Sequence, residues 1–311
     1  MTVPALPTQG GHRSRSIWID RWSVLRRHRP AMVSLMVLVL MAVFCFSASA
    51  YASWMGLDVN ATDLMARFNP PSETNLLGTD EIGRDVLLRL MYGGQVSLTI
   101  GVLATAFGCA IGVTVGVLAG YLGGRADSFL MRATDCMIAL PLVPLLVILA
   151  AIDLGKLGLP PEIVQSPSVS FWRIVIIISL VDWTTIARVV RAGTLTIAHQ
   201  DYVLAARVSG GRAPYMIGIH VLPNVATPII VAATLTIGRV ILLESTLSFL
   251  GVGVMPPTPT WGNMLNNAQE LASTAPMLAV YPGLLIFLTV ITFNFLGDGL
   301  RVAFDPRSQQ R

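Results

Sequence analysis

The stretch LMYGGQVSLTIGVLATAFGCAIGVTVGVLAGYLGG, which runs from Leu90 to Gly124, contains no charged residue. A helix needs roughly 20 mainly apolar residues to cross the hydrocarbon core of a bilayer, which is about 30 Å thick. A backbone in contact with lipid must also satisfy its own hydrogen bonds, as the backbone of a helix does. This stretch therefore predicts a transmembrane helix, and the rest of the chain decides how many others surround it.

The composition of the whole chain agrees with a membrane protein. Of its 311 residues, 54% are apolar and 12% are charged, whereas a soluble domain carries roughly 25% charged residues. Lys156 is the only lysine and is followed by Leu157, so the chain lacks the Gly-Lys-Ser/Thr sequence of an ATP-binding P-loop. The cysteines and histidines show no metal-binding spacing. We therefore expect neither a soluble enzyme nor a metal or cofactor site in this chain.

Five further segments have the length and hydropathy of membrane spans: residues 31–57, 136–152, 171–190, 225–250 and 271–297. The prediction is an all-α, polytopic membrane protein with six transmembrane helices. The alternative for the first run is a signal peptide, since Ala48-Ser49-Ala50 resembles a cleavage site. Its long charged leader and the length of its apolar run favour a retained span.

Basic residues are distributed unevenly between the two sides of this topology. If the N-terminus, the loop around Arg125, residues 188–220 and the C-terminus share one side, fifteen arginines lie there. The other side then carries five basic residues: Arg67, Arg84, Arg89, Lys156 and Arg173. Because cytoplasmic loops carry the excess of Lys and Arg, we expect both termini in the cytoplasm. The net charge of +4 then reflects topology, and no nucleic-acid partner is needed to explain it.

A polar segment before the fifth span reads DYVLAARVSGGRAP over residues 201–214, and VLPN follows at 221–224. The pattern predicts a short helix, a break at the two glycines, and a second helix that enters the membrane. Ala205 and Ala206 allow another surface to come close, and Gly210 can adopt a positive φ without a Cβ clash. By composition alone, the segment is either a docking surface or a simple turn between two spans.

This segment resembles the signature loop of ABC-importer permeases, in which Glu-Ala-Ala-x-x-x-Gly is followed further on by Ile/Val-Leu-Pro. Ala205, Ala206, Gly210, Leu222 and Pro223 match that signature, whereas Leu204 takes the place of the glutamate. In that family the loop forms the coupling helices that dock on an ATPase subunit. The resemblance implies these docking residues: Asp201, Tyr202, Leu204, Ala205, Ala206, Gly210, Gly211, Leu222 and Pro223.

Other motifs extend the resemblance over nearly the whole chain. They are LGTDEIGRDV at 77–86, LSFLGVG at 247–253 with PPTPTWG at 256–262, FNFLGDGLR at 293–301, and DPR at 305–307. Their presence in this order resembles the C-type permease of the dipeptide, oligopeptide and nickel importers.

The resemblance implies a type I ABC-importer permease fold with four parts. These are a cytoplasmic segment at 1–30, the first transmembrane helix and an external loop at 31–92, a five-helix core at 93–299, and a cytoplasmic tail at 300–311. The coupling loop lies within the core at 199–223.

The resemblance also implies a transport function without a chemical step, so the chain is not expected to be an enzyme. It would form half of a pathway for dipeptides or oligopeptides in the bacterial cytoplasmic membrane. The implied partners are a homologous B-type permease, two ABC ATPase subunits that bind ATP and Mg, an extracytoplasmic solute-binding protein and membrane lipid.

Three alternatives stay open beside a peptide importer. The same permease class includes importers of nickel chelates. A secondary transporter would work alone with a proton gradient, through Asp182, Glu244 and Asp135. A membrane-embedded enzyme is disfavoured because no span carries a nucleophile, base and metal-ligand set.

The external segment that follows the first span is a second candidate site. The resemblance favours contact with the binding protein, or gating of an outer vestibule, over a merely solvated loop. The residues concerned are Gly78, Thr79, Asp80, Gly83, Arg84 and Asp85.

Four charged residues lie within the predicted spans: Asp135, Asp182, Arg239 and Glu244. A charge at mid-membrane costs at least about 2.5–3.5 kcal/mol on insertion scales, and such residues usually face the bundle or water. Asp182 and Arg239 fall at similar depth on consecutive spans, which predicts an intramembrane ion pair with a structural or a substrate-facing role. Arg239 and Glu244 are five residues apart and point in different directions on one helix.

Small residues form a stripe on the second span, at Gly101, Gly108, Gly112, Gly116 and Gly120. Such a stripe lets two helix backbones approach closely. We expect packing within the bundle, and the alternative is an interface between two copies of the chain.

Overall fold

The computed structural model describes residues 17–158, 160–164, 166–266, 268–271 and 273–304. Within these ranges the protein has no β-strand, and one isolated bridge joins Thr79 to Asp85. The predicted all-α class is therefore confirmed. The motif at 305–307, residues 1–16 of the N-terminal segment and residues 305–311 of the tail lie outside the described residues.

The positions of the helices along the chain are close to those of the predicted segments. The longer ones are α1 (Ile17–Arg27), α2 (Arg29–Phe46), α3 (Ala48–Met55), α4 (Val86–Leu122), α5 (Gly124–Ala139), α6 (Leu142–Ala150), α8 (Pro167–Ala198), α9 (Asp201–Val208), α11 (Leu222–Phe249) and α13 (Met277–Phe304). The short ones are η1 (Leu64–Ala66), η2 (Leu154–Leu157), α7 (Pro161–Val164), α10 (Ala213–Tyr215), η3 (Met216–Val221), η4 (Asn263–Leu265) and α12 (Ala268–Leu271).

Four helices of the described chain are long and apolar enough to cross a membrane, or up to five if a bent pair counts as one span. The four are α2, α4, the continuous rod Ala213–Phe249, and α13. The six predicted spans thus map onto the helices, but the structure does not establish six crossings. The remaining helix, α8, has 32 residues and carries Arg173, Asp182 and Arg188, which interrupt its apolar run.

Two predicted spans are interrupted in the structure. The run 31–57 divides at Ser47 into α2 and α3, and the Ser47 hydroxyl donates to the Phe44 carbonyl at 2.9 Å. The run 136–152 divides into α5 and α6, which meet at 86°. The residue before a proline is pushed towards extended backbone, and Leu140 before Pro141 has φ −77° and ψ 138°. The hydropathy of these runs does not show such breaks.

The glycine stripe of α4 packs inside the molecule, as predicted. An added Cβ would lie 2.7 Å from the Trp183 carbonyl oxygen at Gly112, and 2.6 Å from the Ala187 carbonyl oxygen at Gly116. Both of these oxygens belong to α8, so the backbones of α4 and α8 are in close contact. Gly101 faces another neighbour, since its added Cβ would lie 2.5 Å from Ile241 of α11.

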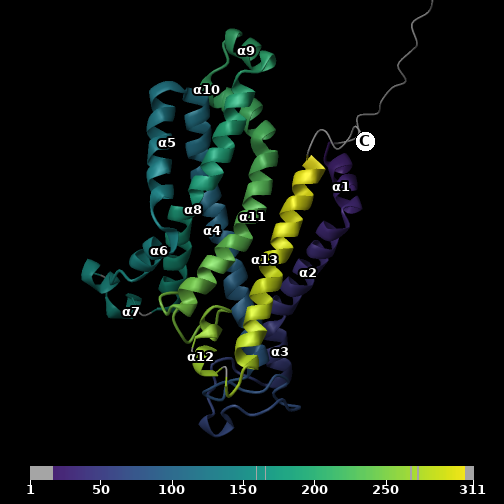
Figure 1. Ribbon diagram of the computed structural model, residues 1–311, viewed down its shortest axis with the longest axis vertical. Coiled ribbons are helices and arrows are strands. Elements are labelled where there is room, and N and C mark those ends of the chain that lie inside the picture. Colours follow the sequence, from purple (N-terminus) through teal and green to yellow (C-terminus); the bar gives the residue numbers. More distant parts are fainter. Residues whose placement is uncertain (1–16, 159, 165, 267, 272, 305–311) are drawn as a thin grey trace, which may run out of the picture.

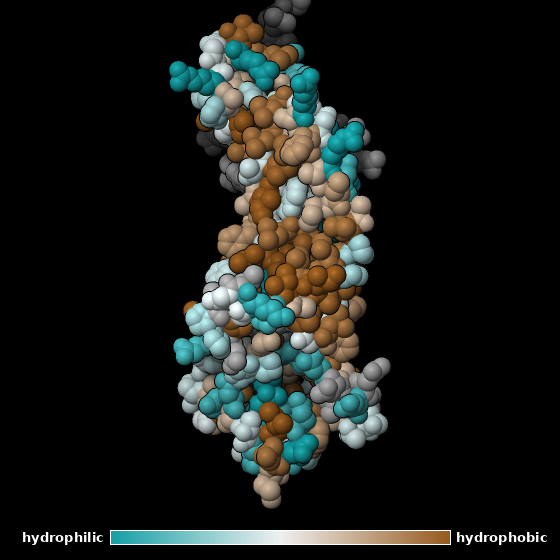
Figure 2. Space-filling model, turned by 90° about the vertical axis from the view of Figure 1, so that its left-hand side faces the viewer, coloured by the Kyte–Doolittle hydropathy of each residue, from teal (hydrophilic) through white to brown (hydrophobic). Residues whose placement is uncertain are grey.

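The molecule is elongated, and its two ends are built from different segments (Figure 1). Helices α9 and α1 lie at one end with the last turns of α13, whereas the loop between α3 and α4 lies at the other with α12. Figure 2 shows a hydrophobic middle section between hydrophilic ends on the face that it presents. An apolar band between polar ends is the arrangement of a protein that crosses a bilayer.

Candidate functional sites

The predicted coupling segment forms a short helix that projects from one end of the bundle. Helix α9 buries Val203 completely, while Asp201, Tyr202, Leu204 and Ala205 are exposed. One side of α9 therefore anchors it to the molecule, and the other side is free for contact with another protein.

The break after α9 is a glycine C-cap with two backbone hydrogen bonds. Gly210 adopts φ +90°, its N–H donates to the Arg207 carbonyl at 3.0 Å, and the Gly211 N–H donates to the Ala206 carbonyl at 3.0 Å. This is the bonding pattern of a Schellman motif. Gly211 also packs tightly, since an added Cβ would lie 2.7 Å from the Met216 sulfur. The two glycines thus fix the direction in which the chain leaves α9.

Aromatic contacts hold α9 against the rest of the molecule. The Arg207 guanidinium lies over the ring of Tyr121, 5.1 Å from its centroid, at the end of α4. The ring centroid of His220 lies 6.0 Å from that of Tyr202 and 5.7 Å from that of Tyr215. A displacement of α9 would therefore act on both α4 and the entry to α11.

The structure separates the predicted docking residues into two groups. The exposed group is Asp201, Tyr202, Leu204, Ala205, Gly210 and Pro223, whereas Ala206, Gly211 and Leu222 are partly buried. Sequence reasoning missed Val208, which is 89% exposed and is the largest apolar addition to this surface.

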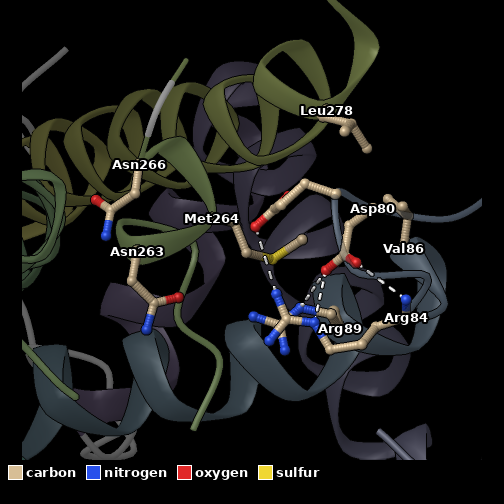
Figure 3. A pocket seen from close by; sticks show the side chains of 9 residues that line it. Asp80, Arg84, Val86, Arg89, Asn263, Met264, Asn266 and Leu278 are labelled. Atoms are coloured by element: carbon tan, nitrogen blue, oxygen red, sulfur yellow. Dashed lines mark hydrogen bonds and ion pairs between the residues drawn. The ribbon is translucent and has the colours of Figure 1, made fainter. Parts of the chain in front are cut away.

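The external segment is organised around Asp80, whose carboxylate faces two arginines (Figure 3). Its Oδ2 accepts a hydrogen bond from Arg84 Nε at 2.7 Å and lies 3.5 Å from Arg89 Nε. Its Oδ1 accepts from the backbone N–H groups of Ile82 at 3.0 Å and Arg84 at 2.9 Å. The loop is thus a folded cap over the start of α4, and its charges are largely used internally.

Asp85 and Thr79 also stabilise this external cap. Asp85 caps α4 by accepting from the Leu88 N–H at 2.6 Å, and its second oxygen accepts from Asn75 Nδ2 at 2.9 Å. The Thr79 hydroxyl accepts from the Asn69 N–H at 2.9 Å and donates to the Ala66 carbonyl.

Two glycines of the predicted external site are required by its geometry. Gly78 and Gly83 have φ of +78° and +79°. An added Cβ would lie 2.4 Å from the Asn69 carbonyl oxygen at Gly78, and 1.8 Å from the Asp63 carbonyl oxygen at Gly83. Neither position tolerates a side chain without a shift of the backbone.

Glu244 is fully buried and pairs with no basic residue among those that the structure describes. It accepts hydrogen bonds from the hydroxyls of Ser248 at 2.7 Å and Ser97 at 3.0 Å. The Ser97 oxygen in turn accepts from the Trp261 N–H at 3.2 Å, and Trp261 Nε1 donates to the Leu90 carbonyl at 2.9 Å. This cluster joins α4, α11 and the loop after α11. The sequence did not predict that the Glu244 carboxylate is bound by hydroxyl groups.

The predicted pair between Asp182 and Arg239 is confirmed. Arg239 Nη2 lies 2.5 Å from Asp182 Oδ1, with the aspartate side chain 5% exposed and the arginine side chain 42% exposed. Asp135, the fourth predicted intramembrane charge, is 60% exposed and pairs with Arg188 at 2.6 Å. The two pairs link α8 to α11 and to α5 respectively.

No group of three or more metal-ligating side chains occurs in the described ranges. Within the same ranges the structure offers the projecting α9, the folded external cap and three charge pairs between helices, Arg188–Asp135, Arg191–Asp127 and Arg239–Asp182.

Two protein families match this chain. Residues 112–310 match the binding-protein-dependent transport system inner membrane component family. Residues 16–71 match the N-terminal transmembrane domain of oligopeptide transport permease C. The first match covers more than half of the chain and includes α9. The chain belongs to this family of inner-membrane transport components.

Two relatives align with this permease over nearly their whole length. The oligopeptide transport system permease protein OppC of Bacillus subtilis is 34% identical over 295 residues, which are 95% of this chain and 91% of the relative. The glutathione transport system permease protein GsiD of Escherichia coli O6:K15:H31 is 36% identical over 305 residues, which are 97% of this chain and 95% of the relative. The resemblance drawn from the motifs is thereby confirmed.

At the end of the molecule that carries the cap, the permease also exposes apolar side chains that the motifs did not indicate. Leu64 is 67% exposed and Met65 is 94% exposed, and both lie on η1 beside the cap. Contact of residues 78–85 with a binding protein stays a prediction, and these two side chains enlarge the surface available for it. Their only sequence signal is an apolar pair within a polar loop.

Proposed function

We propose that this permease is half of the membrane pathway of an ATP-driven importer of dipeptides or oligopeptides. The observation that carries the proposal is α9, a short helix with exposed apolar side chains that is fixed to α4 and to the entry of α11. ATP and Mg would be bound by two ABC ATPase subunits, and the exposed side of α9 would dock on one of them. The names of the matched relatives support peptides over nickel chelates.

The coupling follows from differential contact. An ATPase can shift the permease between two states only if it binds the two states with different free energy. Arg207 on Tyr121 and Tyr202 beside His220 are the contacts through which movement of α9 would reach the transmembrane helices.

We further propose six crossings, with α8 and the bent α5–α6 pair as the two additional ones. Helix α8 has 32 residues, about 48 Å at 1.5 Å per residue, and it packs along α4. The buried charge of Asp182 is paired, which lowers its cost in the membrane. With the excess of arginines on the side of α9, both termini would be cytoplasmic and the cap would face the binding protein.

A homologous B-type permease would complete the pathway. Two charge pairs near the middle of the bundle remain partly exposed in this chain alone, and a second subunit together with the aqueous pathway would cover them. The two partner permeases would each present one coupling segment to the ATPases.

Docking through α9 is tested by Ala205→Trp in the full importer. Ala205 is exposed, so the indole should leave folding and insertion intact but obstruct the ATPase and abolish uptake. Gly210→Trp is less informative because Gly210 has a positive φ. Ala50→Trp, at an exposed alanine of α3 that lies outside both the docking segment and the cap, is the matched control.

The measurements are peptide uptake, the amount of permease in the membrane, and recovery of the ATPase with the purified permease. Normal uptake by the Ala205→Trp variant at normal membrane levels would contradict the docking role. Peptide uptake into vesicles that contain this chain alone, driven by a pH gradient, would instead support the secondary transporter.

A further inference from the structure

A cavity of about 340 Å³ lies where α5, α6, α8 and α11 meet. Its polar lining comes from Asp182, Thr184, Thr185, Arg188 and Arg239, and the remainder is apolar. Two arginines and one aspartate are the charged residues among those that line it; Arg239 pairs with Asp182, and Arg188 pairs with Asp135 of α5.

Among the described residues, the Arg239 guanidinium has N–H donors that no acceptor uses. Both contacts of the Arg239 guanidinium are made through Nη2, to Asp182 Oδ1 at 2.5 Å and to the Thr185 hydroxyl at 3.4 Å. Within the part of the chain that the structure describes, Nε and Nη1 have no contact of this kind, and the side chain is 42% exposed. Each free N–H of a guanidinium can donate one charge-assisted hydrogen bond to a carboxylate oxygen.

The Asp182 carboxylate contacts Arg239 through one of its two oxygens. Its side chain is 5% exposed, and its Oδ2 is buried without a hydrogen-bond partner among the described residues. A buried acceptor without a partner is energetically unfavourable. Asp182 holds Arg239 in place through Oδ1.

The charges also distinguish this face from the lipid-facing one. The groove between α2, α4 and α13 has a volume of about 490 Å³, and Thr99 is the one polar residue among those that line it. Hydrocarbon chains suit such a groove. A charged group in contact with lipid is strongly unfavourable, so the cavity of Arg239 belongs against water or protein.

We infer that this cavity is a transit site of the translocation pathway, in which a free N–H donor of Arg239 binds the C-terminal carboxylate of a peptide. Asp182 is a positioning residue that orients the guanidinium. The inference rests on the proposed function, because it assumes a peptide that passes through the membrane. A site that binds the C-terminal carboxylate does not select among peptide side chains, which suits a pathway for many peptides.

The test uses the complete importer with its binding protein, reconstituted in vesicles. Uptake of a peptide with a free C-terminal carboxylate is compared with uptake of its C-terminal amide, for the parent, Arg239→Gln and the double variant Asp182→Asn/Arg239→Gln. The double variant leaves no unpaired buried charge and keeps the comparison valid if the single variant folds poorly. The binding protein is the same throughout, so its own preference cancels from the comparison between variants.

We expect uptake of the free acid to fall about tenfold in both variants, which corresponds to the loss of one charge-assisted contact. Uptake of the amide should be unchanged, and ATPase stimulation by the binding protein should persist. An equal loss for acid and amide, or no loss for either, would overturn the inference. Absence of ATP-dependent peptide uptake by the parent complex would instead remove the proposed function.

A second measurement does not depend on discrimination between the two peptides. Thr185→Cys, in a chain whose three native cysteines are replaced by alanine, should react with a charged, water-soluble thiol reagent and be protected by the free-acid peptide. Val39→Cys, in the apolar groove, should not react. Failure of Thr185→Cys to react, or labelling that the peptide does not reduce, would contradict a water-filled transit site.

Discussion

At the scale of single residues, this permease accommodates buried charge in two different ways. Glu244 accepts hydrogen bonds from hydroxyl groups and has no basic partner in the described part of the chain, whereas Asp182 pairs with Arg239. The sequence predicts the second arrangement, because two opposite charges at equal depth on consecutive spans have few other partners. The hydroxyls of Ser97 and Ser248 carry no comparable signal, since serines occur throughout the spans.

Glu244→Leu should destabilise the permease more than Glu244→Gln. Leucine removes the acceptor for both serine hydroxyls, and each buried unsatisfied group costs about 1–3 kcal/mol, while glutamine keeps a carbonyl oxygen. Survival of the folded protein on size-exclusion chromatography after heating in detergent measures the difference. Equal melting of the two variants would show that the hydroxyl cluster contributes little.

The pair on α8 and α11 should show strong coupling in a double-mutant cycle. Arg239→Gln leaves Asp182 buried without its cation, and we expect it to cost more stability than Asp182→Asn/Arg239→Gln together. Coupling energies of contacting residues are about 0.5–3 kcal/mol. Midpoints of heat denaturation for the two single variants and the double variant provide the measurement, and additive effects would contradict a functional pair.

At the scale of elements, the α4–α8 contact shows how far a stripe of small residues can be interpreted. Four-residue spacing of glycines predicts a close helix contact. It does not identify the partner helix, because the partner offers its backbone carbonyls, which every helix has. The structure assigns α8 to Gly112 and Gly116 and assigns α11 to Gly101.

Two glycines of the same stripe provide a matched test. Gly116→Ala places a Cβ 2.6 Å from the Ala187 carbonyl, and overpacking of this kind costs about 1–3 kcal/mol. At Gly108 the nearest atom, the Ser179 carbonyl oxygen, lies 3.5 Å away, so Gly108→Ala should be neutral or slightly stabilising. Thermal stability of the two purified variants distinguishes them, and equal stability would contradict a close contact at Gly116.

At the scale of the whole molecule, α9 and the folded cap occupy opposite ends (Figure 1). The motifs of both segments were recognisable in the sequence, but the burial of Thr79, Asp80 and Asp85 was not. Several residues of the predicted contact surface at 78–85 are therefore buried and stabilise the cap. The exposed apolar side chains at this end are Leu64 and Met65.

Labelling of introduced cysteines checks the proposed orientation. In a cysteine-free background, Ala61→Cys should react with a membrane-impermeant maleimide in cells whose outer membrane has been permeabilised, and Ser209→Cys should react only after the inner membrane is opened. Both positions are exposed, so accessibility to the reagent reports the side of the membrane. The reverse pattern would place both termini outside.

The membrane class, the approximate position of the apolar helices and the coupling motif were determined by the sequence alone. They follow from hydropathy and local spacing, which each segment carries independently of its neighbours. The bend between α5 and α6, the hydroxyl shell of Glu244 and the free N–H donors of Arg239 were decided by tertiary structure. Each of these depends on the distance between side chains or backbone groups far apart in the chain, and only the packing of the helices sets that distance.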